Sequence, residues 1–299
     1  RYGIYIVGFF VVVSIFGSFF TMDPLEYVNR PLLEPCLEHP FGTNGQGQDV
    51  LAQTIVGSQT TIWIGFVGGT LVVMVGTLIG GIAGYYGGIM DMLVQRIIEI
   101  MMTIPTFFLI ITVVAFYPGG GIWLIMVIIG LTSWPGVARF TRAEFLKVRN
   151  MDYVTAAQAL GFSAPRTIFR HVLPNAIAPV LVIAVFGIAS AILTESGLSF
   201  LGFGSASTVS WGSILSVARG ATYAWWMAVF PGTAIFITVT IYNLVGEGLR
   251  DAMDPRSHRN CPSPGGHRAS SRRTHPKIVA KNTRLEKTLF GSGGTAELG

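Results

Sequence analysis

The sequence predicts an all-α integral membrane protein with six transmembrane helices. Hydrophobic residues make up 51% of the chain and charged residues only 12%, whereas a soluble domain carries about 25% charged residues. Apolar runs recur between polar or Gly/Pro boundaries, and a helix needs about 20 such residues to cross a bilayer. Half of the twenty Lys and Arg residues follow Leu249. The apolar body of the chain is therefore nearly neutral.

The six predicted spans lie near residues 3–20, 60–84, 92–116, 121–140, 176–201 and 226–246. Residues 1–20 are interpreted as the first transmembrane helix, and a short cytoplasmic lead is expected to precede Arg1. The alternative is a cleaved signal peptide. That alternative is disfavoured because the run from Ile4 to Phe20 lacks a small-x-small cleavage site and is about long enough to span.

Residues 21–59 are expected to form an extracytoplasmic segment before the second span. Glycine is dense within that span, at positions 65, 68, 69, 76, 80, 81 and 84. Small residues allow membrane helices to approach closely. The second span is therefore predicted to be a packed interior helix.

The distribution of basic residues predicts the orientation in the membrane, because short cytoplasmic loops are enriched in Lys and Arg. Basic residues are frequent in 139–171 and in the C-terminal tail, and sparse in 21–59 and 202–225. Six spans satisfy this pattern if both termini and the loop 141–175 are cytoplasmic. Cys36 and Cys261 then lie on opposite sides of the membrane, so no intrachain disulfide is expected.

The loop 141–175 contains signals for short helices of its own. Asp152 is a candidate cap for a helix over 153–160, and Gly161 is a typical stop. Ser163 and Pro165 suit the start of a second helix. The first of these helices would present a small-residue face, formed by Ala156, Ala157 and Ala159, and Pro174 would lie where the chain re-enters the membrane.

One pattern in this loop is specific: Thr-Ala-Ala-x-x-x-Gly over 155–161, nine residues, and then x-x-Leu-Pro ending at Pro174. It resembles the "EAA loop" of ABC importer permeases, with Thr155 in place of the usual acidic residue and His171 where Ile is common. The resemblance implies the type I ABC importer permease fold, in which this loop is a coupling helix that docks on a cytoplasmic ATPase. The coupling residues implied are Tyr153, Thr155, Ala156, Ala157, Leu160, Gly161, Pro165, Leu173 and Pro174.

Three further stretches resemble the C-type permease of the dipeptide, oligopeptide and nickel branch. They are His39 to Leu51, Ser196 to Gly204 with Ser210-Trp-Gly212, and Asn243 to Arg256. The resemblance covers residues 39–256 in order and defines a permease core over 60–256 with five of the spans. Residues 257–299 match no known pattern and are predicted to be a basic, disordered cytoplasmic tail.

The resemblance implies a permease subunit that forms half of a path for di- or oligopeptides in a bacterial or archaeal plasma membrane. The implied partners are a homologous permease, two ATPase subunits, an extracytoplasmic binding protein and membrane lipid, but not nucleic acid. No Gly-x-x-x-x-Gly-Lys-Ser/Thr motif occurs, so ATP and Mg²⁺ are expected in the ATPases and no cofactor in this chain. The five histidines show no ligand spacing for a metal.

Other functions remain open at this point. The same fold imports nickel or other small solutes. A secondary transporter or channel would be expected to show charged relays or broken helices in two matching halves, and the sequence shows neither. An intramembrane enzyme would need clustered catalytic groups, and no catalytic residue is identified.

Two acidic residues lie within or near the apolar spans. Glu195 is either a contact in the pathway or gate, or a structural residue satisfied by hydrogen bonds near the end of a span. Glu99 follows Arg96 by three residues. A local ion pair is therefore predicted between these two side chains.

Overall fold

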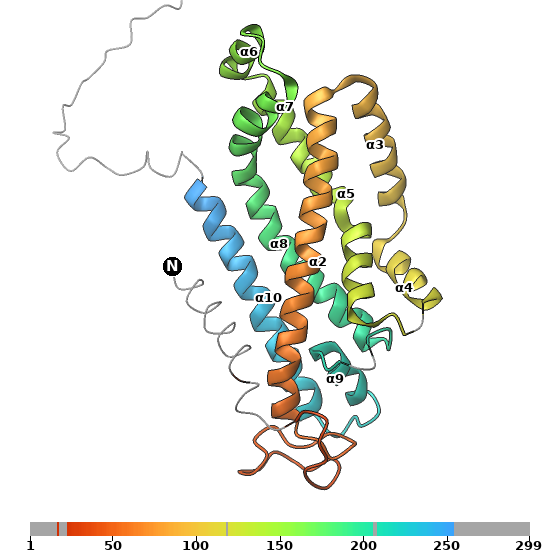
Figure 1. Ribbon diagram of the computed structural model, residues 1–299. Coiled ribbons are helices and arrows are strands. Elements are labelled where there is room, and N and C mark those ends of the chain that lie inside the picture. The colour runs from red at the N-terminus through yellow and green to blue at the C-terminus, as the bar shows by residue number, and fades with distance from the viewer. Residues whose placement is uncertain (1–16, 18–22, 118, 206–207, 254–299) are drawn as a thin grey trace, which may run out of the picture. The chain divides into compact units, whose positions relative to one another are not determined.

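The computed structural model describes residue 17 and residues 23–117, 119–205 and 208–253 (Figure 1). Regular structure in this part of the chain is helical, apart from an isolated bridge between Thr43 and Asp49. The helices are α2 (Val50–Tyr86), α3 (Gly88–Thr103), α4 (Thr106–Phe116), α5 (Gly121–Arg149), α6 (Asp152–Ala159), α7 (Ala164–Thr167), a π-helical turn η1 (Ile168–Val172), α8 (Leu173–Phe200), α9 (Trp211–Ala218) and α10 (Trp226–Met253). The predicted helix over 1–20, except Gly17, and the tail 257–299 lie outside the described residues.

Four described helical runs are long and apolar enough to cross a membrane. They are α2, α5, α10 and the run Ala164–Phe200, in which α7, η1 and α8 follow one another without interruption. The bent pair α3 and α4 adds a fifth if it is a single span. These runs confirm the predicted all-α, multi-span architecture.

Helix α2 begins at Val50, ten residues before the predicted second span. Asp49 caps it, because its Oδ1 accepts a hydrogen bond at 2.9 Å from the backbone N–H of Ala52. The helix ends at Gly87, whose φ of 67° lies in the left-handed region. The last ten residues of the segment predicted over 21–59 are therefore helical and continuous with the predicted span.

The span predicted over 92–116 is broken, with α3 and α4 meeting at an angle of 81°. Ile104 adopts an extended conformation, with φ −88° and ψ 124°, before Pro105. The residue before a proline is sterically disfavoured in the helical region, which explains the break. No broken helix was expected from the sequence, and the structure contradicts that expectation at this position.

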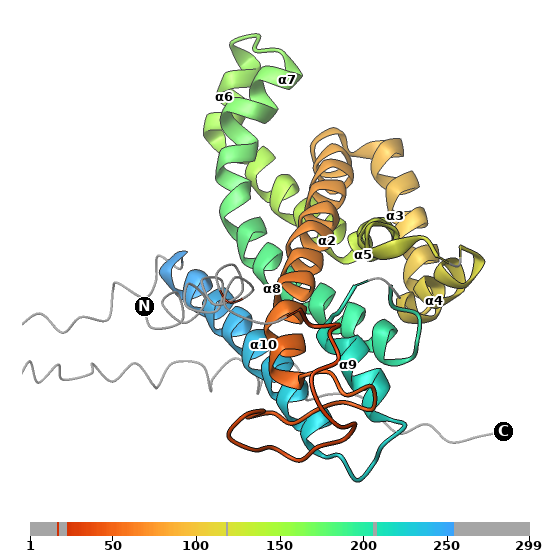
Figure 2. The ribbon, with the colours of Figure 1, turned by 60° about the horizontal axis from the view of Figure 1, so that its bottom comes forward.

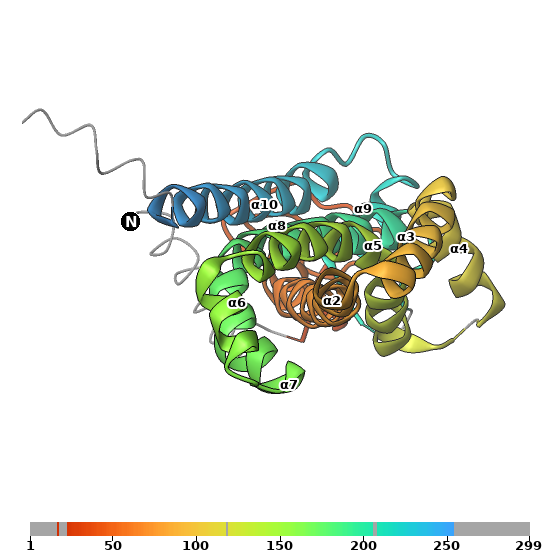
Figure 3. The ribbon, with the colours of Figure 1, turned by 90° about the horizontal axis from the view of Figure 1, so that it is seen from above.

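Helix α2 packs against both α5 and α8, and Figures 1 and 3 show the three helices side by side. Its glycines make the α5 contact possible. A Cβ at Gly76 would lie 2.7 Å from Cβ of Val137, and one at Gly84 would lie 2.6 Å from the carbonyl oxygen of Arg142. Gly80, midway between them, is in contact with the carbonyl oxygen of Ala138. The glycine row bears out the predicted close packing of α2, but only on this face, because the opposite side of the helix is exposed in this chain.

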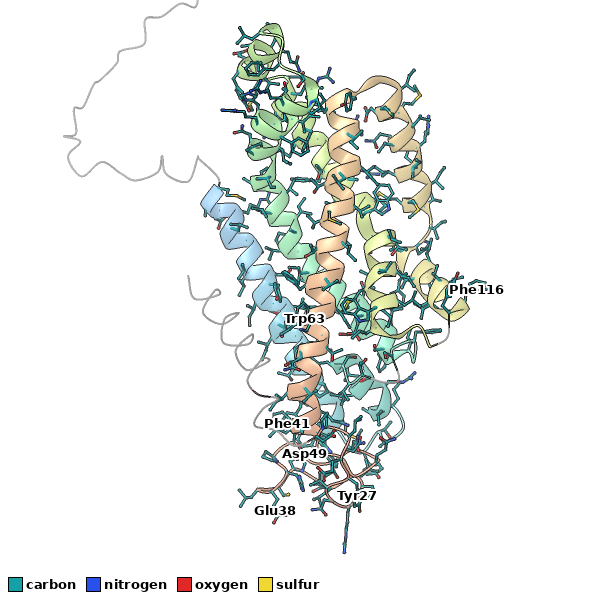
Figure 4. All side chains as sticks on the ribbon, in the orientation of Figure 1. Tyr27, Glu38, Phe41, Asp49, Trp63 and Phe116 are labelled. Atoms are coloured by element: carbon teal, nitrogen blue, oxygen red, sulfur yellow. The ribbon has the colours of Figure 1, made fainter. Side chains whose placement is uncertain are left out.

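The two ends of the bundle are built differently. One end carries α6 and α7, and we call it the α6 end (Figure 1). The other carries α9 and the irregular segment 23–49, and we call it the α9 end (Figure 2). In Figure 4, Asp49 lies where that segment joins α2.

Candidate functional site

The loop between α5 and α8 forms the α6 end, and its local structure follows the predicted signals closely. The N-cap of α6 is Met151 rather than Asp152, which lies in the first turn. After α6, the N–H of Phe162 donates to the carbonyl of Ala157 at 3.2 Å, and that of Gly161 donates to Gln158 at 2.9 Å. This is a Schellman ending. Gly161 has a φ of 82°, a conformation that favours glycine.

The buried face of α6 is set by its own chain. Val154 is fully buried and packs in a cluster with Phe145, Val148 and Val172. Ala157 is only 5% exposed. The predicted small-residue face over Ala156, Ala157 and Ala159 is therefore wrong for Ala157, which faces the protein itself, one turn after Val154 on the same side of the helix.

The remaining predicted coupling residues form two groups. Tyr153, Thr155, Ala156, Leu160, Gly161, Pro165 and Pro174 are exposed, whereas Leu173 is half-buried in the cluster beneath α6. Large apolar side chains are prominent on this surface, with Tyr153 42% exposed and Leu160 76% exposed. We call Met151, Tyr153, Leu160 and Phe162 the exposed loop surface.

The loop is attached to η1 through Phe162. The rings of Phe162 and His171 stack with centroids 6.0 Å apart, and the guanidinium of Arg166 lies 5.2 Å from the Phe162 ring. A cation over an aromatic face is attractive. Phe162 therefore connects α6 to the helical run that continues into α8. That run is unbroken at Pro174, the residue at which the sequence predicted that the chain re-enters the membrane.

An ion pair near the α6 end links two spans and was not predicted. Arg142 of α5 forms a bidentate pair with Asp91 of α3, in which its Nη2 donates to Oδ2 at 2.5 Å and its Nε donates to Oδ1. Both side chains are partly buried. The signal was available as opposite charges flanking apolar runs, but the partner was not deducible from spacing. The predicted local pair is confirmed, since Arg96 Nη1 donates to Glu99 Oε2 at 2.7 Å.

Glu195 lies in α8 toward the α9 end and is 1% exposed. Its carboxyl accepts hydrogen bonds from the hydroxyls of Ser199 at 2.6 Å and Ser196 at 3.4 Å, and it also pairs with Ser210. Ser210 is the N-cap of α9. The carboxyl thus joins α8 to the start of α9.

The beginning of α9 also contacts α2. The indole N–H of Trp211 donates to the carbonyl of Thr54 at 2.8 Å. The next residue, Gly212, leaves no room for a side chain, because a Cβ there would lie 2.7 Å from Cα of Ser196. The Ser-Trp-Gly motif is therefore a packing element between α2 and α8.

The segment 23–49 is ordered by polar contacts. His39 and Asp49 are joined at 2.7 Å between Nδ1 and Oδ2, and the indole of Trp226 donates to the carbonyl of Thr43 at 3.1 Å. No group of three or more His, Cys, Asp or Glu side chains gathers as a metal site would require among the described residues. The contacts of His39 and Thr43 connect the segment to α2 and α10.

Comparison with known proteins agrees with this geometry. Residues 76–259 match the family described as "Binding-protein-dependent transport system inner membrane component". The chain is 36% identical to the dipeptide transport system permease protein DppC of Alkalihalophilus pseudofirmus, with 85% of this chain and 84% of that protein covered. It is 44% identical to a putative peptide transport system permease protein of Brucella suis, with 74% and 75% covered.

Solved structures give the same fold. The methionine ABC transporter MetNI in inward-facing conformations matches with a TM-score of 0.57 and 19% identity, over 67% of this chain and 95% of that chain. An amino acid ABC transporter solved with histidines matches with a TM-score of 0.53 and 15% identity, over 68% and 95%. The chain is a member of the family of inner membrane components of binding-protein-dependent transport systems, the permease subunits of ABC importers.

Proposed function

We propose that this chain is one of two homologous permease subunits of an ABC importer for di- or oligopeptides. The observation that carries the substrate class is the set of relatives covering most of the chain, which are named for dipeptide, oligopeptide or peptide transport. In this assignment, two ATPase subunits bind ATP and Mg²⁺, and an extracytoplasmic protein delivers the peptide. Nickel or another small solute is the alternative cargo.

The α6 end is assigned to the cytoplasm and to the ATPase. The basic residues of 139–171 favour this side. The exposed loop surface supports docking, because apolar side chains such as Leu160 are costly to leave in water and are typical of protein interfaces. The α9 end and residue Cys36 then face outward, and both termini lie in the cytoplasm.

The mechanism follows from how the loop is attached. Val154 packs α6 against α5 and η1, Ala157 is buried on the same side of α6, and Phe162 stacks on His171 of η1. When the ATPases close on their nucleotide, a push on α6 would be transmitted to the continuous run Ala164–Phe200. Tilting of that run would alternate the access of the path between the two sides.

The test is reconstitution. We expect the chain to co-purify with an ATPase and a second permease, and to support ATP-dependent uptake of dialanine, trialanine or hexaalanine into proteoliposomes with the binding protein. Co-purification with uptake of Ni²⁺ and none of these peptides would support the alternative cargo. Uptake driven by an ion gradient without an ATPase would contradict the permease assignment.

Docking at the exposed loop surface has its own test. Leu160→Glu should abolish co-purification of the ATPase or reduce peptide uptake at least tenfold, because a desolvated carboxylate would face the apolar interface. Leu37→Glu is the matched control, since Leu37 is also exposed but lies at the α9 end. Retention of coupled uptake by Leu160→Glu at wild-type membrane levels would contradict the docking assignment.

A further inference from the structure

Halfway along the bundle, a cavity of about 390 Å³ opens where α3 and α4 meet. Hydroxyl side chains from three elements border it: Thr106 of α4, Thr132 and Ser133 of α5, and Ser190 and Thr194 of α8. No charged residue lines it. A cluster of hydroxyls is unusual in spans whose other exposed side chains are mainly apolar.

The depth of the cavity is near the middle of the membrane spans. Ser190 lies ten residues before the end of α8 at Phe200, or about 15 Å at a rise of about 1.5 Å per residue. Thr132 lies eleven residues after the start of α5, or about 17 Å by the same rise. The hydroxyls are therefore well inside the apolar layer and not at its surface.

The cavity is not covered by the chain itself. A Cβ placed at Gly136, which borders it, would meet nothing within 4 Å, and Thr106 and Ser190 are exposed. Thr132 and Thr194 donate to carbonyls of their own helices at 2.7 and 2.8 Å. Their oxygens remain able to accept, and the side-chain hydroxyls of Ser133 and Ser190 form no hydrogen bond within the described part of the chain.

The exposed side of α2 provides the contrast. Its exposed stripe consists of Trp63, Phe66, Met74, Leu78 and Ile82, interrupted only by Thr70. Trp63 is labelled on this helix in Figure 4. Such a surface suits lipid or a partner helix. The apolar stripe of α2 is therefore expected to contact lipid or an apolar helix, whereas the hydroxyl-lined surface can also bind a polar group.

The remaining lining defines the chemistry of the ligand. Met101 and Met102 of α3 and Phe107 of α4 border the cavity beside the hydroxyls. Thioethers adapt to side chains of different shape, whereas hydroxyls donate to carbonyls and accept from N–H groups. The volume is at the lower end of the range for small-molecule sites, about 300–1,000 Å³. A short uncharged stretch of peptide main chain meets both requirements.

We propose that this cavity, which we call the hydroxyl cavity, is a contact site for the main chain of the transported peptide within the translocation path. The proposal rests on the proposed function and adds to it the side of the subunit that faces the path. Hydroxyls of α5 and α8 would replace water around peptide amide groups in transit. The methionines and the ring of Phe107 would accommodate varied side chains without selecting among them.

The test uses thiol labelling in the reconstituted complex with the binding protein. In a Cys36→Ser, Cys261→Ser background, Ser190→Cys is exposed to a membrane-impermeant methanethiosulfonate, with and without nucleotide. Phe66→Cys and Leu78→Cys, on the apolar stripe of α2, are the controls. We expect Ser190→Cys to react at least tenfold faster than the controls, and trialanine with ATP to slow its reaction at least threefold.

Each other outcome overturns the inference. Labelling of Ser190→Cys no faster than the controls would mean that lipid or a partner helix covers the cavity. Fast labelling that trialanine does not slow would mean a water-filled space without peptide contact. If Ser190→Cys fails to assemble, Gly136→Cys takes its place, because its added side chain meets open space. Trialanine uptake by the wild type is measured first, so failure of the peptide assignment is recognised separately.

Discussion

At the scale of single residues, Glu195 shows how a carboxyl is retained inside a membrane span. An ionisable group there is costly unless it has partners. Glu195 has three, the hydroxyls of Ser196, Ser199 and Ser210, and the last of these belongs to the cap of α9. We therefore assign Glu195 a role in holding α9 on α8, and propose that it affects the path through that helix.

Substitutions at Glu195 separate shape from hydrogen bonding. Glu195→Gln keeps acceptor oxygen and length, and we expect near-normal uptake. Glu195→Leu leaves buried hydroxyls unpaired, each at a cost of about 1–3 kcal/mol, and should lower the thermal stability of the purified complex. Equal melting temperatures for Glu195→Leu and wild type, measured in the same detergent, would contradict this role.

The pair Asp91–Arg142 is the second residue-scale prediction. Because the pair is bidentate and partly buried, a double-mutant cycle with Asp91→Asn and Arg142→Gln should give a coupling energy of about 1.5–3 kcal/mol. Arg96 and Glu99 form the control pair, at 73% and 54% side-chain exposure, where coupling should stay below about 0.5 kcal/mol. Equal coupling in the two cycles would refute a structural role for the buried pair.

At the scale of elements, the close contact of α2 with α5 requires glycines, which have no side chain, on the facing surface of α2. Gly76, Gly80 and Gly84 recur every four residues and so lie on one face of α2. The backbone of α5 approaches this face closely enough that Gly80 contacts a carbonyl group. Even one methyl group there must push the two helices apart.

Gly80→Ala should therefore reduce assembled complex in the membrane at least fivefold. Gly232→Ala in α10 is the control, since a Cβ there meets nothing within 4 Å, and we expect it to behave as wild type. The amounts of the Gly80→Ala and Gly232→Ala complexes are compared by quantitative immunoblotting of membranes. The stability of each purified complex is then measured in detergent. Normal levels of a stable Gly80→Ala complex would contradict this prediction, because α5 could then move away from α2 without lowering assembly or stability.

The elements also show what the sequence could and could not predict. Apolar runs predicted the spans because they depend on composition alone, but the break at Pro105 was not predicted. The start of α2 at Val50 was missed because Gln53 and Thr54 are polar, yet both are buried. The buried face of α6 was missed because Val148 and Val172, which are distant in sequence from each other, determine it.

At the scale of the whole molecule, the described spans carry two surfaces of different character. The apolar stripe of α2 and the hydroxyl cavity between α3, α5 and α8 are both exposed. The cavity was not predictable from periodicity, because α8 is apolar around most of its circumference and only the neighbouring helices decide which residues remain uncovered. Among the residues that the structure describes, one helix pair is broken, that of α3 and α4.

The hydrogen bond from Trp226 to Thr43 joins residues 183 positions apart. Phe41 and Phe230 stack beside it with centroids 3.8 Å apart, and Val50 packs against Trp226 and Met227. During synthesis, the contacts of the segment 23–49 with α10 can therefore form only after α10 has been made. In a nascent chain halted before residue 226, the segment 23–49 would lack these contacts. It would therefore stay sensitive to proteases after the earlier spans had inserted.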